Sequence, residues 1–262
     1  MTRVGVFGAG GRMGIAVCHA VHDDPELELV AAVDPHYAGI DICEVTGISG
    51  CTFEVSSTPA SFIQERVDVA IDFTQPAAAR QNLEFCAANG IHDVIGTSGF
   101  TDDDFESIAA LFTSSNCLIA PNFALGAVLM MRFAELAAPY FETGEIIELH
   151  HDQKIDAPSG TAMSTAERMA AASKDWGDDP TESETIANAR GASGPAGIHV
   201  HSIRMRGMVA HQEVILGTAG QTLSIRHDSY DRSSFMPGVV LAAKRVADHR
   251  GLTVGLDSVL GI

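Results

Sequence analysis

The chain has 262 residues, and its 34 acidic against 16 basic side chains give a formal net charge of −18. Such a charge argues against nucleic acid or an anionic membrane surface as partner, because phosphate groups require a basic face. No apolar run approaches the roughly 18 residues of a membrane helix, and the start leaves no room for a signal peptide, so we expect a soluble, cytoplasmic chain. The five cysteines form no C-x-x-C pair, and we expect them to be reduced thiols.

The first predicted elements are a strand, a glycine-rich turn and a helix. Residues 4–7 form an apolar strand, and residues 8–14 read Gly-Ala-Gly-Gly-Arg-Met-Gly before a helix that runs to about Val21. Glycines at this spacing let the backbone approach a pyrophosphate, which the N–H groups at the helix start can bind. A second strand, residues 27–33, ends at Asp34, whose carboxylate can accept hydrogen bonds from ribose hydroxyls. Such turns also serve packing alone, but together these features predict a dinucleotide-binding domain.

The alternation of strand and helix then continues. Three further pairs follow, at residues 67–73 with 76–89, 93–95 with 102–114, and 117–120 with 125–141. This order predicts a doubly wound parallel sheet of the Rossmann type. Because ligands of such sheets bind beyond the carboxyl ends of the strands, we expect residues 73–74, 96–99 and 121–123 to line one crevice.

The cofactor preference depends on two residues of the first unit. Asp34 repels a 2′-phosphate and is followed by Pro35, which favours NAD. Arg12, within the glycine turn, can reach the adenosine ribose or its phosphate. We therefore expect NADH to be used and NADPH to be accepted as well.

Proton donors and cations gather at one place in the second half. A strand-like run at residues 145–151 ends in His150 and His151, and Lys154 follows before a helix that opens at residues 158–161. The helix start offers N–H groups to a carboxylate, Lys154 adds a charge, and histidine exchanges protons near neutral pH. This combination suits an anionic substrate that is protonated during turnover. We predict no metal, because His150 and His151 are adjacent strand residues that point to opposite faces and would form a poor zinc chelate. The alternative is a structural role, in which the histidines are hydrogen-bonded and Ser159 caps the helix.

The rest of the chain predicts a second domain. Residues 174–197 are rich in Gly, Pro and acidic residues and predict a long mobile loop. Strands at residues 199–205, 211–216 and 221–227 follow one another without helices, and a helix covers residues 234–248. We expect an α/β fold: a dinucleotide-binding domain of residues 1–122 and 234–262, and an α+β domain with an open mixed sheet, residues 123–233, for substrate binding and oligomerisation.

Residues 148–162, Glu-Leu-His-His-Asp-Gln-Lys-Ile-Asp-Ala-Pro-Ser-Gly-Thr-Ala, closely resemble the signature E-x-H-H-x-x-K-x-D-x-P-S-G-T-A of the 4-hydroxy-tetrahydrodipicolinate (dihydrodipicolinate) reductase family. The resemblance extends to residues 8–14, 73–74, 96–99, 121–123, 206–207 and 209–211. It implies NAD(P)H-dependent reduction of 4-hydroxy-tetrahydrodipicolinate to tetrahydrodipicolinate in diaminopimelate and lysine biosynthesis. Hydride would pass to C4 of the dehydrated ring, and protonation would complete the reduction.

The same resemblance implies residue roles and assembly. His150 would be the general acid/base and Lys154 the second proton donor. The cyclic dicarboxylate substrate would be held by His151, Ser159, Gly160 and Thr161. The cofactor would be lined by Gly8, Ala9, Gly10, Gly11, Arg12, Met13, Asp34, Thr74, Gly96, Thr97, Ser98, Ala120, Pro121, Asn122 and Phe123. Family members are typically homotetramers that pair through the second-domain sheet, and their final helix packs on the first domain. Pro35 and the acidic segment 174–197 depart from the family pattern.

Three other functions fit the sequence less well. Semialdehyde and glyceraldehyde-phosphate dehydrogenases need a cysteine nucleophile in the second domain, but no cysteine follows Cys117. Sugar dehydrogenases of similar build would carry a lysine–proline pair where this chain reads Ala120-Pro121-Asn122. A nucleotide-sensing regulator has no need of His150 and Lys154 together.

Overall fold

Two stretches far apart in the sequence, Met1–Phe123 and Phe235–Ile262, fold into one compact unit, and Ala124–Ser234 forms a second. The computed structural model describes all 262 residues. Each junction between the units lies one residue later than the sequence prediction placed it. None of the helices has the length and apolar character needed to cross a membrane.

Unit 1 is built on a six-stranded parallel sheet with the order β11-β5-β4-β3-β1-β2. Its strands are β1 (Thr2–Phe7), β2 (Leu27–Val33), β3 (Val69–Asp72), β4 (His92–Ile95), β5 (Cys117–Ile119) and β11 (Leu252–Val254). After β2 the chain returns past β1 to form β3, so the direction of winding reverses between β1 and β3, where such sheets bind ligands. The predicted Rossmann-type sheet is confirmed, and β11 is an edge strand that the sequence did not reveal.

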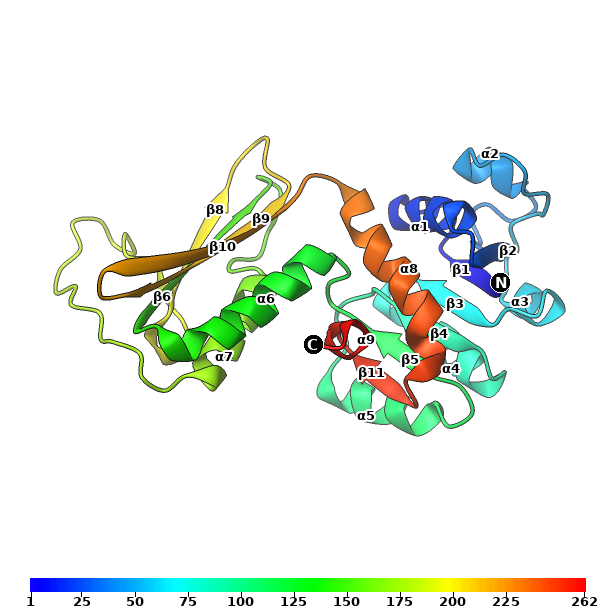
Figure 1. The fold of residues 1–262 in the computed structure, drawn as a ribbon. Coiled ribbons are helices and arrows are strands. Elements are labelled where there is room, and N and C mark those ends of the chain that lie inside the picture. Colours follow the sequence, from blue (N-terminus) through cyan, green and yellow to red (C-terminus); the bar gives the residue numbers. More distant parts are fainter. The chain divides into compact units, whose positions relative to one another are not determined.

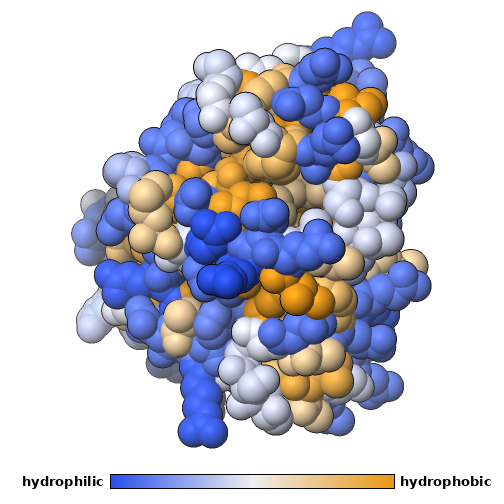
Figure 2. Space-filling view, turned by 90° about the vertical axis from the view of Figure 1, so that its right-hand side faces the viewer, coloured by the Kyte–Doolittle hydropathy of each residue, from blue (hydrophilic) through white to orange (hydrophobic).

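Helices cover both faces of this sheet. They are α1 (Arg12–Asp23), α2 (Ile42–Thr46), α3 (Ala60–Gln64), α4 (Pro76–Ala88), α5 (Asp102–Leu111), α8 (Met236–Arg245) and α9 (Asp257–Leu260), with a 3-10 turn at Val246–Asp248. The long helices α1 and α8 lie side by side on one face, and α4 and α5 lie on the other (Figure 1). On the face of unit 1 that bears α2 and α3, hydrophilic side chains separate smaller apolar areas (Figure 2).

Local sequence explains where several of these helices start. Proline opens α4 at Pro76, where its missing N–H costs nothing. Thr101 and Asp104 form a capping box at the start of α5. A buried apolar cluster then joins the sheet to α4 and α5, with Phe7, Leu83 and Ile108 among its members. This core fixes the strand ends at which the predicted cofactor residues stand.

Unit 2 carries a mixed five-stranded sheet with the order β10-β9-β6-β8-β7. Its strands are β6 (Thr143–His150), β7 (Ala192–Ser193), β8 (His199–Arg204), β9 (Ala210–Thr218) and β10 (Gln221–Ser229). Only β6 and β8 pair in parallel, so the predicted open mixed sheet is confirmed. The helices α6 (Leu125–Ala137) and α7 (Gly160–Ala172) cover one face (Figure 1), and 3-10 turns occupy Ala138–Tyr140, Pro195–Gly197 and Arg232–Phe235.

The segment 174–197, predicted as a long mobile loop, is irregular except for β7 and the turn at Pro195–Gly197. Side chains nevertheless attach it to the sheet. Arg190 donates from both terminal nitrogens to the carboxylate of Glu145 on β6. Glu184 accepts from the backbone N–H groups of Asn188 and Arg190, each at 2.8 Å. The loop is therefore anchored near its C-terminal end.

Candidate active site

The glycine turn between β1 and α1 forms a cradle of bare backbone. Gly8 has a φ of +67°, which favours glycine, and a Cβ on Gly14 would lie 2.0 Å from the Gly8 carbonyl oxygen. Gly11 caps α1 without a side-chain hydrogen bond, so the first N–H groups of the helix remain for a ligand. The residues present therefore fit the pyrophosphate of a dinucleotide.

Asp34 joins this cradle to the segment that follows β2. The residue is 8% exposed, and its carboxylate accepts from the N–H groups of Gly10 and His36, each at 3.0 Å. The ring of Tyr37 covers Gly10, because a Cβ there would lie 2.2 Å from the ring. Arg12 is exposed at the first position of α1 and pairs with no carboxylate of the chain. Both oxygens of Asp34 thus serve backbone donors, while the Arg12 cation stays available.

A second group of predicted cofactor residues stands at the ends of β3 and β4. Thr74 donates from its hydroxyl and its N–H to Asp72, at 2.6 and 2.7 Å. The Thr74 carbonyl accepts from the buried Thr97 hydroxyl at 2.8 Å. A Cβ on Gly96 would lie 2.0 Å from the Phe73 ring, so only glycine allows this close approach. The two loops are therefore fixed against each other.

The ends of β5 and β1 complete this group. The ring of Phe123 lies 5.5 Å from that of Phe73. Ala120, the residue after β5, is buried, whereas Pro121 is exposed. A Cβ on Gly8 would lie 2.9 Å from a methyl carbon of Thr74. Sequence-predicted cofactor residues from four strand ends thus meet at one edge of the sheet in unit 1.

In unit 2 the predicted acid His150 is the last residue of β6 and contacts a buried carboxylate. Its Nδ1 lies 2.5 Å from Oε2 of Glu148, whose side chain is 0% exposed. Glu148 also accepts from both terminal nitrogens of Arg204 at 2.8 Å each, and from the N–H of Ser159 at 3.2 Å. Burial alone raises the pKa of Glu148, but hydrogen bonds from His150 and Arg204 lower it to about 2. Glu148 is thus a carboxylate at neutral pH, and Nδ1 of His150 carries the proton.

Lys154, the second predicted proton donor, lies in the loop between β6 and α7. Its ammonium donates to both oxygens of Asp156, at 2.8 and 2.9 Å. The Lys154 side chain is 21% exposed and that of Asp156 is 57% exposed. Because an exposed ion pair contributes little, a substrate carboxylate can replace Asp156 as the partner of Lys154.

The predicted carboxylate-binding turn is the start of α7. Ser159 is the N-cap, and its hydroxyl oxygen accepts from the N–H of Ala162 at 3.2 Å. Gly160 is exposed, with open space where a Cβ would stand, and Thr161 follows it. His151 is exposed one residue beyond the proposed acid. The structure places all six predicted catalytic and substrate residues in the short run from the end of β6 to the start of α7.

Sequence reasoning did not assign roles to Glu148 and Arg204. Arg204 lies 56 positions from Glu148, so no local pattern links the two. A signal was nevertheless present, because Glu148 shares the inward face of β6 with the buried Ile146. An acidic side chain at an inward position needs a donor or cation, and that requirement points to the arginine of a neighbouring strand.

Known protein families and sequences match the chain over nearly its whole length. A model of the dihydrodipicolinate reductase N-terminus matches residues 2–123, and one of the C-terminus matches residues 126–260. The 4-hydroxy-tetrahydrodipicolinate reductase of Corynebacterium urealyticum is 47% identical, with 100% of each chain covered. The enzyme of that name from Geobacillus kaustophilus is also 47% identical, with 98% of each chain covered.

A solved structure agrees with these sequences. The dipicolinate-bound dihydrodipicolinate reductase of a Paenisporosarcina species superposes with a TM-score of 0.86 at 41% identity, over 98% of this chain and 99% of that one. At this identity and coverage the match concerns more than the general fold. The chain therefore belongs to the dihydrodipicolinate reductase family.

Proposed function

We propose that the chain reduces 4-hydroxy-tetrahydrodipicolinate to tetrahydrodipicolinate in diaminopimelate and lysine biosynthesis, with His150 and Lys154 as its proton donors. The chain is an NAD(P)H-dependent oxidoreductase by family, and its first unit has the matching nucleotide-binding fold. One observation carries the assignment of the acid. It is the His150 ring held by an ionised, buried Glu148 beside the start of α7.

His150 is suited to donate a proton through one ring nitrogen. Glu148 accepts from Nδ1, so Nε2 is left to exchange a proton with the substrate. The side chain is 16% exposed, which limits water access without closing it. Once the 4-hydroxyl group has left as water, the bound nicotinamide would supply a hydride to C4 of the dehydrated ring. His150 would add the proton that completes reduction of the conjugated double bond.

The substrate is a cyclic dicarboxylate, and two features of the loop suit its charge. Lys154 exchanges Asp156 for a substrate carboxylate and serves as second proton donor. Gly160 and Thr161 receive a carboxylate at the positive end of α7, with Ser159 fixing the turn and His151 at its edge. These donors also orient the ring toward His150.

For the dinucleotide we propose the residues at the strand ends of unit 1. The pyrophosphate lies on the turn of Gly8, Ala9, Gly10, Gly11, Arg12 and Met13, and Asp34 contacts the adenosine ribose. The remaining contacts come from Thr74, Gly96, Thr97, Ser98, Ala120, Pro121, Asn122 and Phe123. The unpaired Arg12 supports acceptance of a 2′-phosphate, and hence use of both NADH and NADPH.

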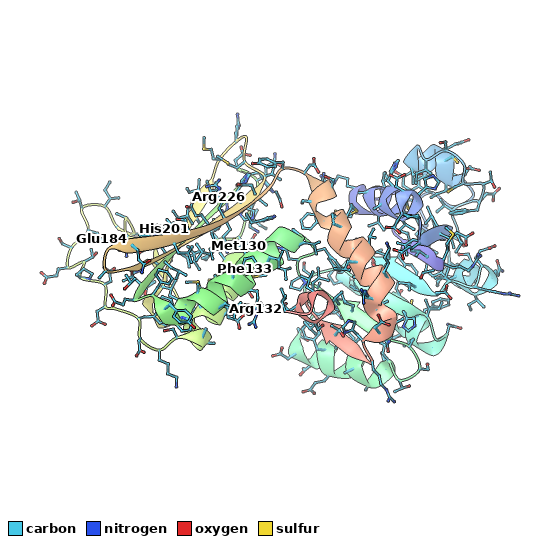
Figure 3. All side chains as sticks on the ribbon, viewed as in Figure 1. Met130, Arg132, Phe133, Glu184, His201 and Arg226 are labelled. Atoms are coloured by element: carbon cyan, nitrogen blue, oxygen red, sulfur yellow. The ribbon has the colours of Figure 1, made fainter.

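We also propose a cytoplasmic homotetramer that assembles through the sheet of unit 2. Both helices of this unit cover the same face, and the other face presents partly exposed apolar side chains such as Ile147 and Ile203. His201 of β8 and Arg226 of β10, labelled in Figure 3, belong to this helix-free face, part of which the segment 174–197 covers through Arg190 and Glu145. Five free cysteines favour a reducing compartment. Light scattering measures the mass of the assembly in solution, and the mass of a monomer would exclude the proposed homotetramer.

The activity is tested with the condensation product of aspartate semialdehyde and pyruvate, made in the cuvette by a synthase. We expect consumption of NADH and of NADPH, followed by the loss of nicotinamide absorbance, only when the chain and the synthase are both present. A folded chain that binds NADH yet consumes none would refute the proposed reaction.

A further inference from the structure

We infer that Arg204 is a positioning residue for this reaction, which holds His150 and the loop 151–159 in one arrangement through Glu148 and sets how firmly the His150 ring retains its proton. The inference rests on the proposed role of His150 as proton donor. Arg204 acts through Glu148 and does not contact the substrate in this scheme.

The position of Arg204 allows it to join three parts of the site. It ends β8 and stands opposite His150 where β8 pairs with β6. Its two terminal nitrogens each donate to one oxygen of Glu148 at 2.8 Å. Nη2 also donates to the carbonyl oxygen of Asp156 at 2.7 Å. One guanidinium therefore fastens both the buried carboxylate and the loop that carries Lys154.

Glu148 in turn is shared between the acid and the substrate turn. It accepts from the ring of His150 on β6 and from the N–H of Ser159 at the start of α7. Any shift of the carboxylate would move both donors relative to each other. The planar fork of Arg204 matches the carboxylate at two points and prevents that shift, which a point charge cannot do.

The ion pair is a poor source of stability, which favours a functional role. The side chains of Glu148 and Arg204 are 0% and 19% exposed, so the cost of removing both from water offsets much of their attraction. The Nε atom of Arg204 is buried without a hydrogen-bond partner, which adds to that cost. The benefit lies instead in the arrangement of the groups bonded to the pair.

Glu148 and Arg204 place opposite charges near the His150 ring. Among the titratable and charged groups of the site, Glu148 bonds the His150 ring, and Arg204 on β8 stands opposite His150 and bonds Glu148. His151 follows β6, Lys154 and Asp156 pair with each other in the loop, and β9 places the uncharged Ala210 opposite His150. Arg204 neutralises the charge of Glu148. Without Arg204 the carboxylate holds a protonated ring more firmly, and without the carboxylate the ring is held less firmly.

Three variants separate charge from geometry in the pH profile of kcat/KM. We expect Arg204→Gln to move the alkaline limb to higher pH and Glu148→Gln to move it to lower pH, each by about one pH unit. Arg204→Lys keeps the charge but loses the fork. We expect it to leave the limb in place and to lower kcat about 100-fold, because the acid is misplaced.

A matched control exists on the same strand. Glu145 lies three residues before Glu148, on the opposite face of the sheet, where it binds Arg190 and His201. Glu145→Gln removes a comparable ion pair, and we expect it to keep both kcat and the position of the limb. Light scattering on each variant verifies that assembly is unchanged, since this face belongs to the proposed interface.

Opposite movement of the limb in Arg204→Gln and Glu148→Gln supports the inference. Movement in the same direction, or unchanged kcat and profile in Arg204→Lys, would overturn it. If Arg204→Gln does not fold, Arg204→Lys and Glu148→Gln still decide the question. Inactive wild-type enzyme would refute the proposed function. Active wild-type enzyme together with Arg204 variants whose kcat and pH profile are unchanged would refute only the positioning role of Arg204.

Discussion

Two buried acidic side chains, Asp93 on β4 of unit 1 and Glu148 on β6 of unit 2, are both 0% exposed, and yet they differ in their hydrogen-bond partners. Glu148 accepts from Arg204, His150 and Ser159, whereas neither oxygen of Asp93 has a well-formed hydrogen bond. The only donors that act on Asp93 are the weak Cys86 thiol and the N–H of Val94.

The two environments move the pKa values in opposite directions. Burial, together with the charge of Asp72, raises the pKa of Asp93 well above its ordinary range. Burial acts the same way on Glu148, but the donors around it overcome the effect and lower its pKa to about 2. Two carboxyl groups without exposed surface therefore have pKa values shifted in opposite directions, and the donors around Glu148 account for its downward shift.

The largest expected effect comes from replacing His150, whose ring the Glu148 carboxylate holds. We expect His150→Gln to lower kcat by about 10²- to 10⁴-fold, because the proton donor is lost. The free energy of unfolding should change little, since the amide can still donate to Glu148. Steady-state kinetics with urea unfolding measure both quantities. His201→Gln is the control, because His201 also bonds a glutamate, Glu145, but on the helix-free face. Equal losses of kcat in both variants would show that His150 is not the proton donor.

The second prediction removes the charge itself. Glu148→Leu leaves the partly buried guanidinium of Arg204, 19% exposed, without its carboxylate, and we expect a loss of about 3 kcal/mol in the free energy of unfolding. Chemical denaturation of wild type and variant at neutral pH measures the loss. An unchanged stability would mean that Arg204 reaches water as soon as Glu148 is gone, and the contrast with Asp93 would weaken.

The third prediction is a gain in stability in place of a loss. Asp93→Val replaces an unpartnered polar group by an apolar one of similar size in a strand, and we expect a gain of about 1–3 kcal/mol in the free energy of unfolding. The matched control is Asp72→Val on the neighbouring strand, where the carboxylate accepts from Thr74 and Asn82. That variant should lose stability. Equal losses in both variants would show that Asp93 also has a partner.

The sequence predicted the long elements and missed the short ones. β1 to β6 and β8 to β10 each have an apolar run or an alternating pattern, which periodicity reveals. The strand β11 has three residues and α2 has five, too few for any period. The equally short β5 was predicted only because it continues the alternation of strand and helix, which β11 and α2 do not. Helix ends also shifted, since the run predicted at 125–141 ends as an α-helix at Ala137 and continues as a 3-10 turn to Tyr140.

At the site, the sequence located residues that lie close together in the chain. His150, Lys154 and Ser159 fall within ten positions, so a local motif displays them. Arg204 reaches Glu148 only because β8 pairs with β6, and Asp93 meets Cys86 only through packing of the core. Such relations depend on tertiary structure, and alternation along a strand indicates at most that a charged side chain points inward and needs a partner.

The smallest expected effect, counted per pH unit, is the pH dependence of the free energy of unfolding. Asp93 and Glu148 contribute to it with opposite signs. Above its ordinary pKa, near 4, Asp93 in the unfolded chain releases its proton while the native residue keeps it. The free energy of unfolding therefore falls as pH rises, by at most about 1.4 kcal/mol per unit. Glu148 acts in the opposite sense, because its contribution is complete above its ordinary pKa and is lost as pH falls toward about 2.

The measurement is the difference in unfolding free energy between wild type and Asp93→Val, taken by urea denaturation from weakly acidic to weakly alkaline pH. We expect the advantage of the valine variant to grow with pH and to level off once native Asp93 ionises. Glu148 cancels in this difference, because both proteins contain it. A constant difference across the range would mean that native Asp93 is already ionised, and burial without partners would then not suffice to keep an acid neutral in this fold.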